Sequence, residues 1–158
     1  AERYRRSLYL FRKRSMPDPV LSTLDSPNGD ASCARRPRSN TPLAALTGLN
    51  EPVFVEAAQA LAQRVLNEAA PTDADRLNRA WQLCTSRLPT EKERHLLLKL
   101  LAENRDRLRK GELKAGDIAF SPFTKPEDLP PEATPNDLAA WTLLSRVLLN
   151  LDETITKS

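Results

Sequence analysis

Apolar residues recur every three or four positions along much of this chain, which is the spacing of helices that bury one face. The two clearest repeats lie at residues 53–69 and 72–88. The first comprises Phe54, Ala57, Ala58, Leu61, Val65 and Leu66, and the second comprises Leu77, Ala80, Trp81, Cys84 and Leu88. We predict a helix over each repeat, the second from Thr72 to about Arg87, with both apolar faces in a common core.

Helix start signals flank two further elements. Thr41 can cap a short helix that opens at Pro42 and ends near Asn50, because the first helical position needs no N–H and therefore suits proline. The last helix opens in the same way at Thr134–Pro135. It presents an apolar face around Trp141 and runs to about residue 150.

A capping box predicts the start of the longest helix. Thr90 can accept hydrogen bonds from the early N–H groups, while Glu93 reaches back to the cap. The helix is expected to run to Lys110 and to stop at Gly111, since glycine adopts the left-handed conformation of a C-cap without strain.

Two stretches lack a helical period and carry most of the prolines. Residues 1–40 are basic and irregular. We expect residues 16–39 to form an ordered coil over the helices, while residues 7–11 form either a short strand or a helical turn. Residues 112–134 are too long for an ordinary connection in a compact domain. They form either a segment that wraps the bundle, held by Ile118, Phe120 and Phe123, or a mobile insertion.

These elements predict an all-α fold: a bundle of four main helices plus one short helix, with a proline-rich basic N-terminal coil and a long wrapping loop before the last helix. We expect the 158 residues to form a single helical domain. Its parts are a basic irregular arm (1–40), a helical part (41–111), a loop (112–134), and a final helix and tail (135–158). Because the only methionine is Met16, we expect the chain to be a fragment of a longer multidomain protein.

Charge is unevenly distributed although the net charge is only +3. Residues 1–38 contain nine Lys or Arg residues and four Asp or Glu residues, so this quarter of the chain carries +5. A basic arm beside a nearly neutral body attracts polyanions. The other interpretation, which we favour, is that these arginines pair with carboxylates elsewhere in the fold.

One group of residues in the arm has the composition of an anion site. Its members are Arg5, Arg6, Asp25, Arg35, Arg36, Arg38 and Asn40. Guanidinium groups bind carboxylates, sulfates and phosphates through paired hydrogen bonds. The same residues can instead join the coil to the bundle through ion pairs, and we favour this structural role.

Aromatic residues are interleaved with the arginines of residues 3–14, at Tyr4, Tyr9 and Phe11. Stacking beside neutralised phosphates is how single-stranded nucleic acids are held. The stretch is short and no nucleic-acid motif accompanies it, so a nucleic-acid partner is disfavoured.

Other reactive residue types give no catalytic pattern. Cys33 and Cys84 are the only cysteines; they allow one disulfide in an exported protein but provide no metal spacing and no haem attachment motif. Asp152 and Glu153 are adjacent and point apart, so we expect them to be solvated or paired with arginines. The sequence contains no phosphate loop or nucleophile motif. We therefore assign no catalytic residue, metal site or cofactor to the chain, and we find no signal peptide or membrane span.

Several short motifs together resemble one family over essentially the whole chain. They are Arg5-Arg6-Ser7-Leu8-Tyr9, Leu24-Asp25, Cys33, Arg36, Asn40-Thr41-Pro42-Leu43, Ala45-Leu46, Leu49-Asn50, Pro52 with Phe54-Val55-Glu56-Ala57-Ala58, Arg87-Leu88-Pro89-Thr90-Glu91 and Leu148-Leu149-Asn150-Leu151-Asp152-Glu153. The family is the planctomycete-specific C-terminal domain of unknown function, the PSD family, which is found in large exported proteins with cytochrome-c-like domains. Two positions depart from its pattern. Ala44 replaces a glutamine that would complete a capping box with Thr41, and Leu24 replaces an aromatic residue.

The resemblance implies an exported or periplasmic, cell-envelope location, with haem and carbohydrate-recognition domains elsewhere in the parent polypeptide. It implies no established activity. Our first hypothesis is a non-catalytic accessory or scaffold domain that packs against upstream domains of the same polypeptide. The alternatives are part of an enzyme cleft that acts on an anionic polysaccharide, and polyanion or nucleic-acid binding through the basic arm.

Overall fold

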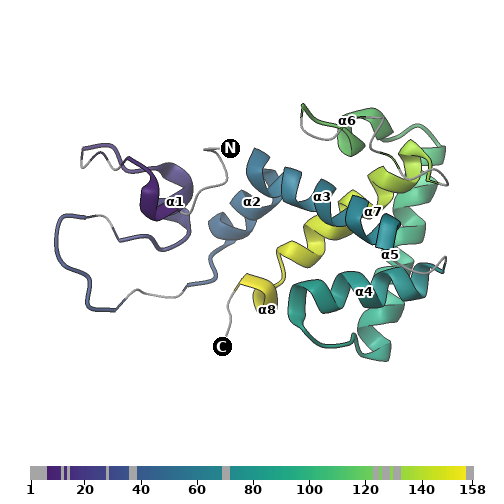
Figure 1. The fold of residues 1–158 in the computed structure, drawn as a ribbon, viewed down its shortest axis with the longest axis horizontal. Helices are drawn as coiled ribbons and strands as arrows, with labels where there is room; N and C mark the ends of the chain where they lie inside the picture. Colours follow the sequence, from purple (N-terminus) through teal and green to yellow (C-terminus); the bar gives the residue numbers. More distant parts are fainter. Residues whose placement is uncertain are drawn as a thin grey trace. The chain divides into compact units, whose positions relative to one another are not determined.

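The computed structural model describes residues 7–11, 13, 15–27, 29–35, 39–68, 72–122, 125, 129 and 133–155, and its regular elements are helices (Figure 1). The predicted all-α fold is therefore confirmed. In chain order the elements are η2 (Ser7–Tyr9), α1 (Pro19–Thr23), α2 (Pro42–Asn50), α3 (Pro52–Glu68), α4 (Asp73–Thr85), α5 (Glu91–Arg109), α6 (Ala115–Ala119), α7 (Pro135–Leu149) and α8 (Asp152–Ile155).

The chain divides into two compact units, residues 1–47 and 48–158, each described by itself below. The boundary lies inside α2 and not at residue 40, where the composition changes. Whether the whole chain forms the expected single domain stays a prediction.

Helix α7 is the centre of the larger unit (Figure 1). It contacts α3, α4, α5, α6 and α8, and more than half of its residues are buried. The buried residues are Leu138, Ala139, Ala140, Trp141, Thr142, Leu144, Ser145 and Leu148. A helix that is buried on most sides must be surrounded by other helices, which explains why α3, α5 and α6 all turn their apolar faces toward α7.

The apolar repeats of the sequence form the core of this unit, with one exception. Trp81 and Trp141 are buried as predicted. Leu88 was predicted to continue the apolar face of α4, but its side chain is 56% exposed, so that prediction is wrong. The reason is that Ser86 adopts a left-handed conformation with φ 62° and ends α4 at Thr85.

The predicted caps are present at the helix starts. Thr41 Oγ1 accepts a hydrogen bond from the Ala44 N–H at 3.1 Å, and Thr90 forms the expected capping box with Glu93. Thr134 forms a second capping box with Asp137, which was not predicted because the usual motif has Glu or Gln at that position.

The segment before α7 wraps the bundle over the part that the structure describes. Ile118 and Phe120 pack against the core, and Ala119 is fully buried in the short helix α6. The buried Gln59 of α3 donates a hydrogen bond from Nε2 to the Ile118 carbonyl at 2.9 Å. The wrapping interpretation is therefore confirmed for this stretch; Phe123 lies outside the described residues.

The smaller unit, which was predicted to be irregular, contains a 3-10 turn and one short helix before α2 begins. Asp18 caps α1 by accepting a hydrogen bond from the Leu21 N–H at 2.9 Å. Pro19 occupies the first turn, where its missing N–H costs nothing. Thr23 of α1 donates a hydrogen bond to Thr47 of α2 at 3.3 Å, which joins the two helices within this unit.

Candidate functional site

Asp25 is the predicted anion-site residue whose surroundings the structure describes best. Its backbone is left-handed, with φ 56°, a conformation that Asp tolerates better than most residues. Its half-buried carboxylate accepts hydrogen bonds from the Ser39 N–H at 2.6 Å and from Ser39 Oγ at 2.8 Å. Asp25 therefore ties the turn after α1 to the segment that enters α2.

Asp25 makes a further polar contact beyond those to Ser39, and of the other predicted anion-site residues the structure describes Arg35 and Asn40. Arg35 and Asn40 are exposed, and Asn40 has a partner of its own. Arg5, Arg6, Arg36 and Arg38 lie outside the described residues. The ligand site in the arm stays a prediction.

The two cysteines have different environments. Cys33 is exposed and Cys84 is half-buried on α4, and both are free thiols in the structure. Burial raises the pKa of the Cys84 thiol to about 11. The sequence allows a disulfide between them in an exported protein, and thiol titration can test whether it forms.

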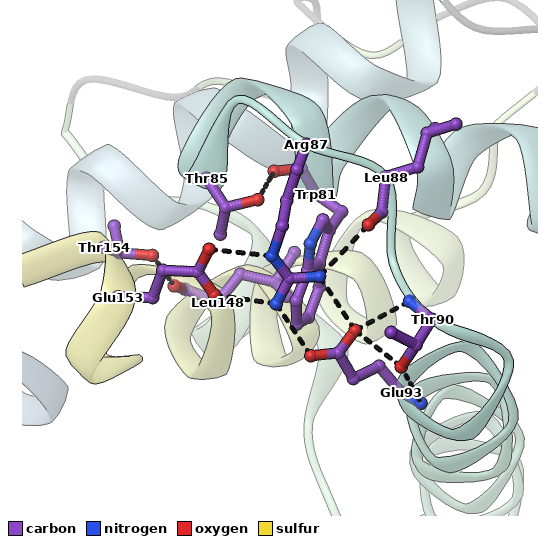
Figure 2. Close-up of polar contacts among 9 residues, drawn as sticks. All are labelled: Trp81, Thr85, Arg87, Leu88, Thr90, Glu93, Leu148, Glu153 and Thr154. Atoms are coloured by element: carbon purple, nitrogen blue, oxygen red, sulfur yellow. Dashed lines mark hydrogen bonds and ion pairs between the residues drawn. The ribbon is translucent and has the colours of Figure 1, made fainter.

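The most connected polar group is the Arg87 cluster, which we define as Arg87, Trp81, Glu93 and Glu153 (Figure 2). Arg87 donates from Nε and Nη2 to the two oxygens of Glu153 at 2.8 and 2.7 Å. It also donates from Nη2 and Nη1 to the two oxygens of Glu93 at 2.8 and 3.0 Å. The guanidinium carbon lies 5.0 Å from the centre of the Trp81 ring, within the range of a cation–π contact.

The five donors of this guanidinium are all occupied, because the fifth hydrogen bond goes from Nη1 to the Leu88 carbonyl at 3.1 Å. Both carboxylates are bound in the paired geometry that arginine makes best. Arg87 thus joins the α4–α5 connection to α8, and no donor is left to bind an external anion.

Local backbone conformation places each member of the Arg87 cluster. The left-handed Ser86 ends α4 and directs the next residue across the face of Trp81 (Figure 2). Glu93 is fixed by its capping box, in which Oε2 accepts hydrogen bonds from Thr90 N and Oγ1 at 2.7 and 2.8 Å. Glu153 belongs to the first turn of α8, where its negative charge also interacts favourably with the helix dipole.

The acid–base properties of the cluster follow from these bonds. Hydrogen bonds from Arg87, followed by those from the Thr90 backbone, lower the pKa of Glu93 to about 2. The hydrogen bond from Arg87 also lowers the pKa of Glu153, and the two glutamates raise the pKa of Arg87. All three groups therefore keep their charges near neutral pH and are not poised to transfer protons.

A second arginine joins the helices α4, α5 and α7. Arg105 of α5 donates from Nη2 to Asp73 Oδ1 at 2.9 Å and from Nη1 to the other oxygen of the same carboxylate. Its Nη2 lies 3.5 Å from Asp137 Oδ1. Asp73 begins α4 and Asp137 is in the first turn of α7, so Arg105 links two helix starts to the C-terminal part of α5.

The end of α2 is fixed against the end of α7. Arg146 donates to the Leu49 carbonyl from Nε at 3.1 Å and also from Nη2. A Cβ atom added at Gly48 would lie 2.6 Å from Asn150 Oδ1, so a larger residue at this position would displace that side chain. An open pocket of about 210 Å³ lies beside this contact, lined by Leu49, Leu100, Asn104, Leu143, Arg146 and Val147. Arg146 is the cationic residue of this lining, and its guanidinium already binds the Leu49 carbonyl. Arg146 therefore serves the contact between α2 and α7.

Arg87, Glu93 and Glu153 each belong to a sequence motif described above, but no motif assigns them to a common site. Arg87 and Glu153 are 66 positions apart, and each was quoted in a separate motif of the family resemblance. Asp152 and Glu153 were expected to be solvated or paired with arginines, and Glu153 is paired. The signal that could have linked them is an arginine beside a helix cap together with an unassigned acidic pair near the end of the last helix.

Two searches for other kinds of site cover the described part of the chain. Within it, no group of three or more His, Cys, Asp or Glu side chains is arranged to hold a metal ion. None of the helices seen there has the length and apolar character that crossing a membrane requires.

Comparison with known proteins identifies a family. The family model of PSD1, a protein of unknown function (DUF1553), matches residues 1–101. Neither a curated protein nor a solved structure matches the chain.

Proposed function

This chain belongs to the PSD1 family of proteins of unknown function (DUF1553), and from that premise we propose that it is a non-catalytic accessory domain that packs against other domains of a longer polypeptide. We further propose that this polypeptide is an exported planctomycete-type protein of the cell envelope, with cytochrome-c-like domains upstream. The domain would act as a scaffold that fixes the position of its neighbours.

The observation that carries the proposal is the apolar surface of α2. Leu43 and Leu46 are 58% and 57% exposed, although leucine usually occupies the core of a helical protein. The two residues are three positions apart and therefore lie on one face of the helix. An exposed apolar surface of this kind is typical of a region that another domain covers.

The fixed position of α2 also supports a docking role. Arg146 and the close approach at Gly48 hold the end of α2 on α7, the most buried helix of the larger unit. A partner that binds Leu43 and Leu46 would therefore bind a helix whose C-terminal end is already ordered. Preorganisation of this kind lowers the entropic cost of association.

The arginine contacts support a scaffold more than a catalytic centre. Arg87 and Arg105 are the best-connected cations of the described residues, and their carboxylate partners come from the same chain. Their contacts join the ends of α4, α5, α7 and α8. We infer that these charged side chains serve to hold the helices together.

Hydrogen–deuterium exchange on the full-length polypeptide and on this chain alone tests the proposal. Residues 42–53 are expected to exchange at least tenfold more slowly in the full-length polypeptide, because a neighbouring domain covers them. Leu43→Ser with Leu46→Ser should remove that added protection. Leu96→Ser on α5, where the leucine is 67% exposed, is the matched control and should leave it intact.

Equal exchange of residues 42–53 in the two proteins would refute the proposal. So would concentration-dependent dimerisation of this chain that disappears in the Leu43→Ser, Leu46→Ser variant, because a second copy would then be the partner.

A further inference from the structure

We propose that the pocket lined by the end of α2 and by α5 and α7 binds a small aliphatic carboxylate. The pocket has a volume of about 210 Å³, and all of its lining residues belong to the larger unit. The proposal does not depend on the docking role of Leu43 and Leu46, because neither leucine lines the pocket. It rests on the aliphatic walls and on two polar side chains that the described part of the chain leaves incompletely bonded.

Three helices supply the walls of the pocket. Leu100 and Asn104 are four positions apart on α5, and Leu143 and Val147 have the same spacing on α7, so each pair lies on one face of its helix. Leu49 closes the pocket from the end of α2. Four of the six lining residues are therefore aliphatic, and they favour a ligand with a hydrocarbon chain.

Asn104 is the first of the two polar side chains. The residue is 7% exposed and lines the pocket, and no hydrogen bond joins its amide to another of the described residues. Its Nδ2 and Oδ1 are not among the atoms that the fold closes off completely. Because a buried amide without a partner costs stability, a ligand oxygen that accepts from Nδ2 would bind favourably here.

Arg146 is the second polar side chain. It binds the Leu49 carbonyl through Nε and Nη2, which uses two of the five N–H donors of a guanidinium. Carboxylates of the same chain occupy Arg87 and Arg105, whereas no Asp or Glu of the described residues forms an ion pair with Arg146.

The charge and geometry of Arg146 select the acceptor. Its three remaining donors lie on the two Nη atoms, and that end of a guanidinium can hold both oxygens of a carboxylate. The positive charge favours an anion over a neutral carbonyl or hydroxyl group. A carboxylate between Arg146 and Asn104 would therefore receive charge-assisted hydrogen bonds from the arginine and a further bond from the amide.

The volume of the pocket limits the size of the ligand. A water molecule occupies about 30 Å³ of the liquid, so the pocket holds about seven groups of that size. Pockets for drug-sized ligands are larger, at roughly 300–1,000 Å³. A branched acid with about six carbon atoms, such as isocaproate, fits this volume. Its hydrocarbon end contacts the aliphatic walls, and its carboxylate faces Arg146 and Asn104.

Titration of the isotope-labelled 158-residue chain with isocaproate, followed by two-dimensional NMR, tests the proposal. We expect saturable shifts of the Asn104 side-chain amide and of the backbone amides around Leu100 and Val147, at ligand concentrations up to about 10 mM. Isocaproamide, the neutral analogue, should bind at least tenfold more weakly because it lacks the charge. Acetate should also bind at least tenfold more weakly because it has no chain to cover the walls.

Two pairs of variants locate the ligand. Asn104→Leu keeps the side-chain volume but removes the amide, and it should weaken isocaproate binding at least tenfold. Asn78→Leu on α4 is the matched control, because the half-buried Asn78 also has an Oδ1 without a partner among the described residues but does not line the pocket. Leu143→Phe narrows the pocket and should likewise weaken binding at least tenfold, whereas Leu96→Phe at an exposed position of α5 should not. Thermal unfolding shows that each variant is folded, and the Leu143 pair tests the proposal even if Asn104→Leu does not fold.

Three outcomes would overturn the proposal. One is the absence of saturable shifts around the pocket with isocaproate. Another is equal binding of isocaproamide, which would assign the pocket to an uncharged apolar group. The third is binding that neither Asn104→Leu nor Leu143→Phe weakens, which would place the ligand elsewhere on the protein. The exchange of residues 42–53 is measured without any carboxylate, so failure of this proposal and failure of the docking proposal can be distinguished.

Discussion

Replacing Gln59 with leucine is expected to loosen α6 from the bundle. Gln59 is almost completely buried in α3, and its Nε2 supplies a hydrogen bond to the Ile118 carbonyl at 2.9 Å. Leucine has a similar volume but no donor, so that backbone carbonyl would be left inside the protein without this partner. A buried polar group that loses its hydrogen bond costs about 1–3 kcal/mol. Removing the buried amide offsets a part of that cost.

The net loss of stability is therefore expected to be about 1–2 kcal/mol, which corresponds to a fall in Tm of roughly 2–8 °C for a chain of this size. Urea unfolding gives the free energy, and hydrogen exchange locates the change. Residues 115–120 should lose protection more than α4 does, because α6 contacts α7 and is joined to α3 by this bond.

Gln82→Leu is the matched control, since Gln82 is exposed on α4 and the same substitution there removes no buried contact. It should change stability by less than about 0.5 kcal/mol. If Gln59→Leu were as stable as the parent and residues 115–120 kept their protection, the hydrogen bond would not hold α6, and the reasoning would be wrong.

Three further predictions concern other parts of the larger unit and the two thiols. Gly48→Ala should lower the free energy of unfolding by about 1–3 kcal/mol, measured by urea unfolding, because the new methyl group would clash with the Asn150 side chain. In the double variant Gly48→Ala, Asn150→Ala the smaller residue at 150 removes the clash, so most of the lost stability should return. The pKa of Glu93 is about 2 in the folded protein against 4.5 for an ordinary glutamate, so its contribution to stability is complete above pH 4.5 and disappears as the pH falls toward 2. Glu93→Gln should therefore be less stable than the parent at pH 7, and the difference should shrink by pH 2.5; a constant difference would contradict the assignment. In the folded protein at pH 8, Cys33 should react with a thiol reagent at least tenfold faster than Cys84, because Cys33 is exposed and the pKa of Cys84 is about 11. If neither cysteine reacts after the protein is unfolded without a reductant, the two form a disulfide instead.

The sequence predicted the long helices well because their signals are local. The apolar repeats of α3 and α4 need only the spacing of neighbouring residues, and the capping box at Thr90 needs only the residue at Glu93. The same reasoning missed α1 and α6, which have five residues each. A helix of that length makes too few internal hydrogen bonds to be predicted from local pattern, and in α6 the burial of Ala119 provides the stabilisation.

The candidate site was harder to predict because its contacts join distant parts of the chain. Nothing near Arg87 in the sequence indicates that its partner is Glu153. The error at Leu88 has a related cause. The apolar repeat of α4 continues in the sequence as far as Leu88, but the left-handed Ser86 ends the helix before it. A non-glycine residue in that conformation is held there by its surroundings, which only the folded structure supplies.

The central helix of the larger unit comes late in the chain, and this affects how the protein can be made. Residues 135–149 leave the ribosome after α3, α4 and α5, yet α3 and α5 contact α7 more extensively than they contact any other helix. Until α7 emerges, the apolar faces around Val65, Leu77 and Leu101 have no common surface to cover. This part of the nascent chain therefore stays open until residues 135–149 have been synthesised, which is the period when holdase chaperones can bind it and when it can aggregate.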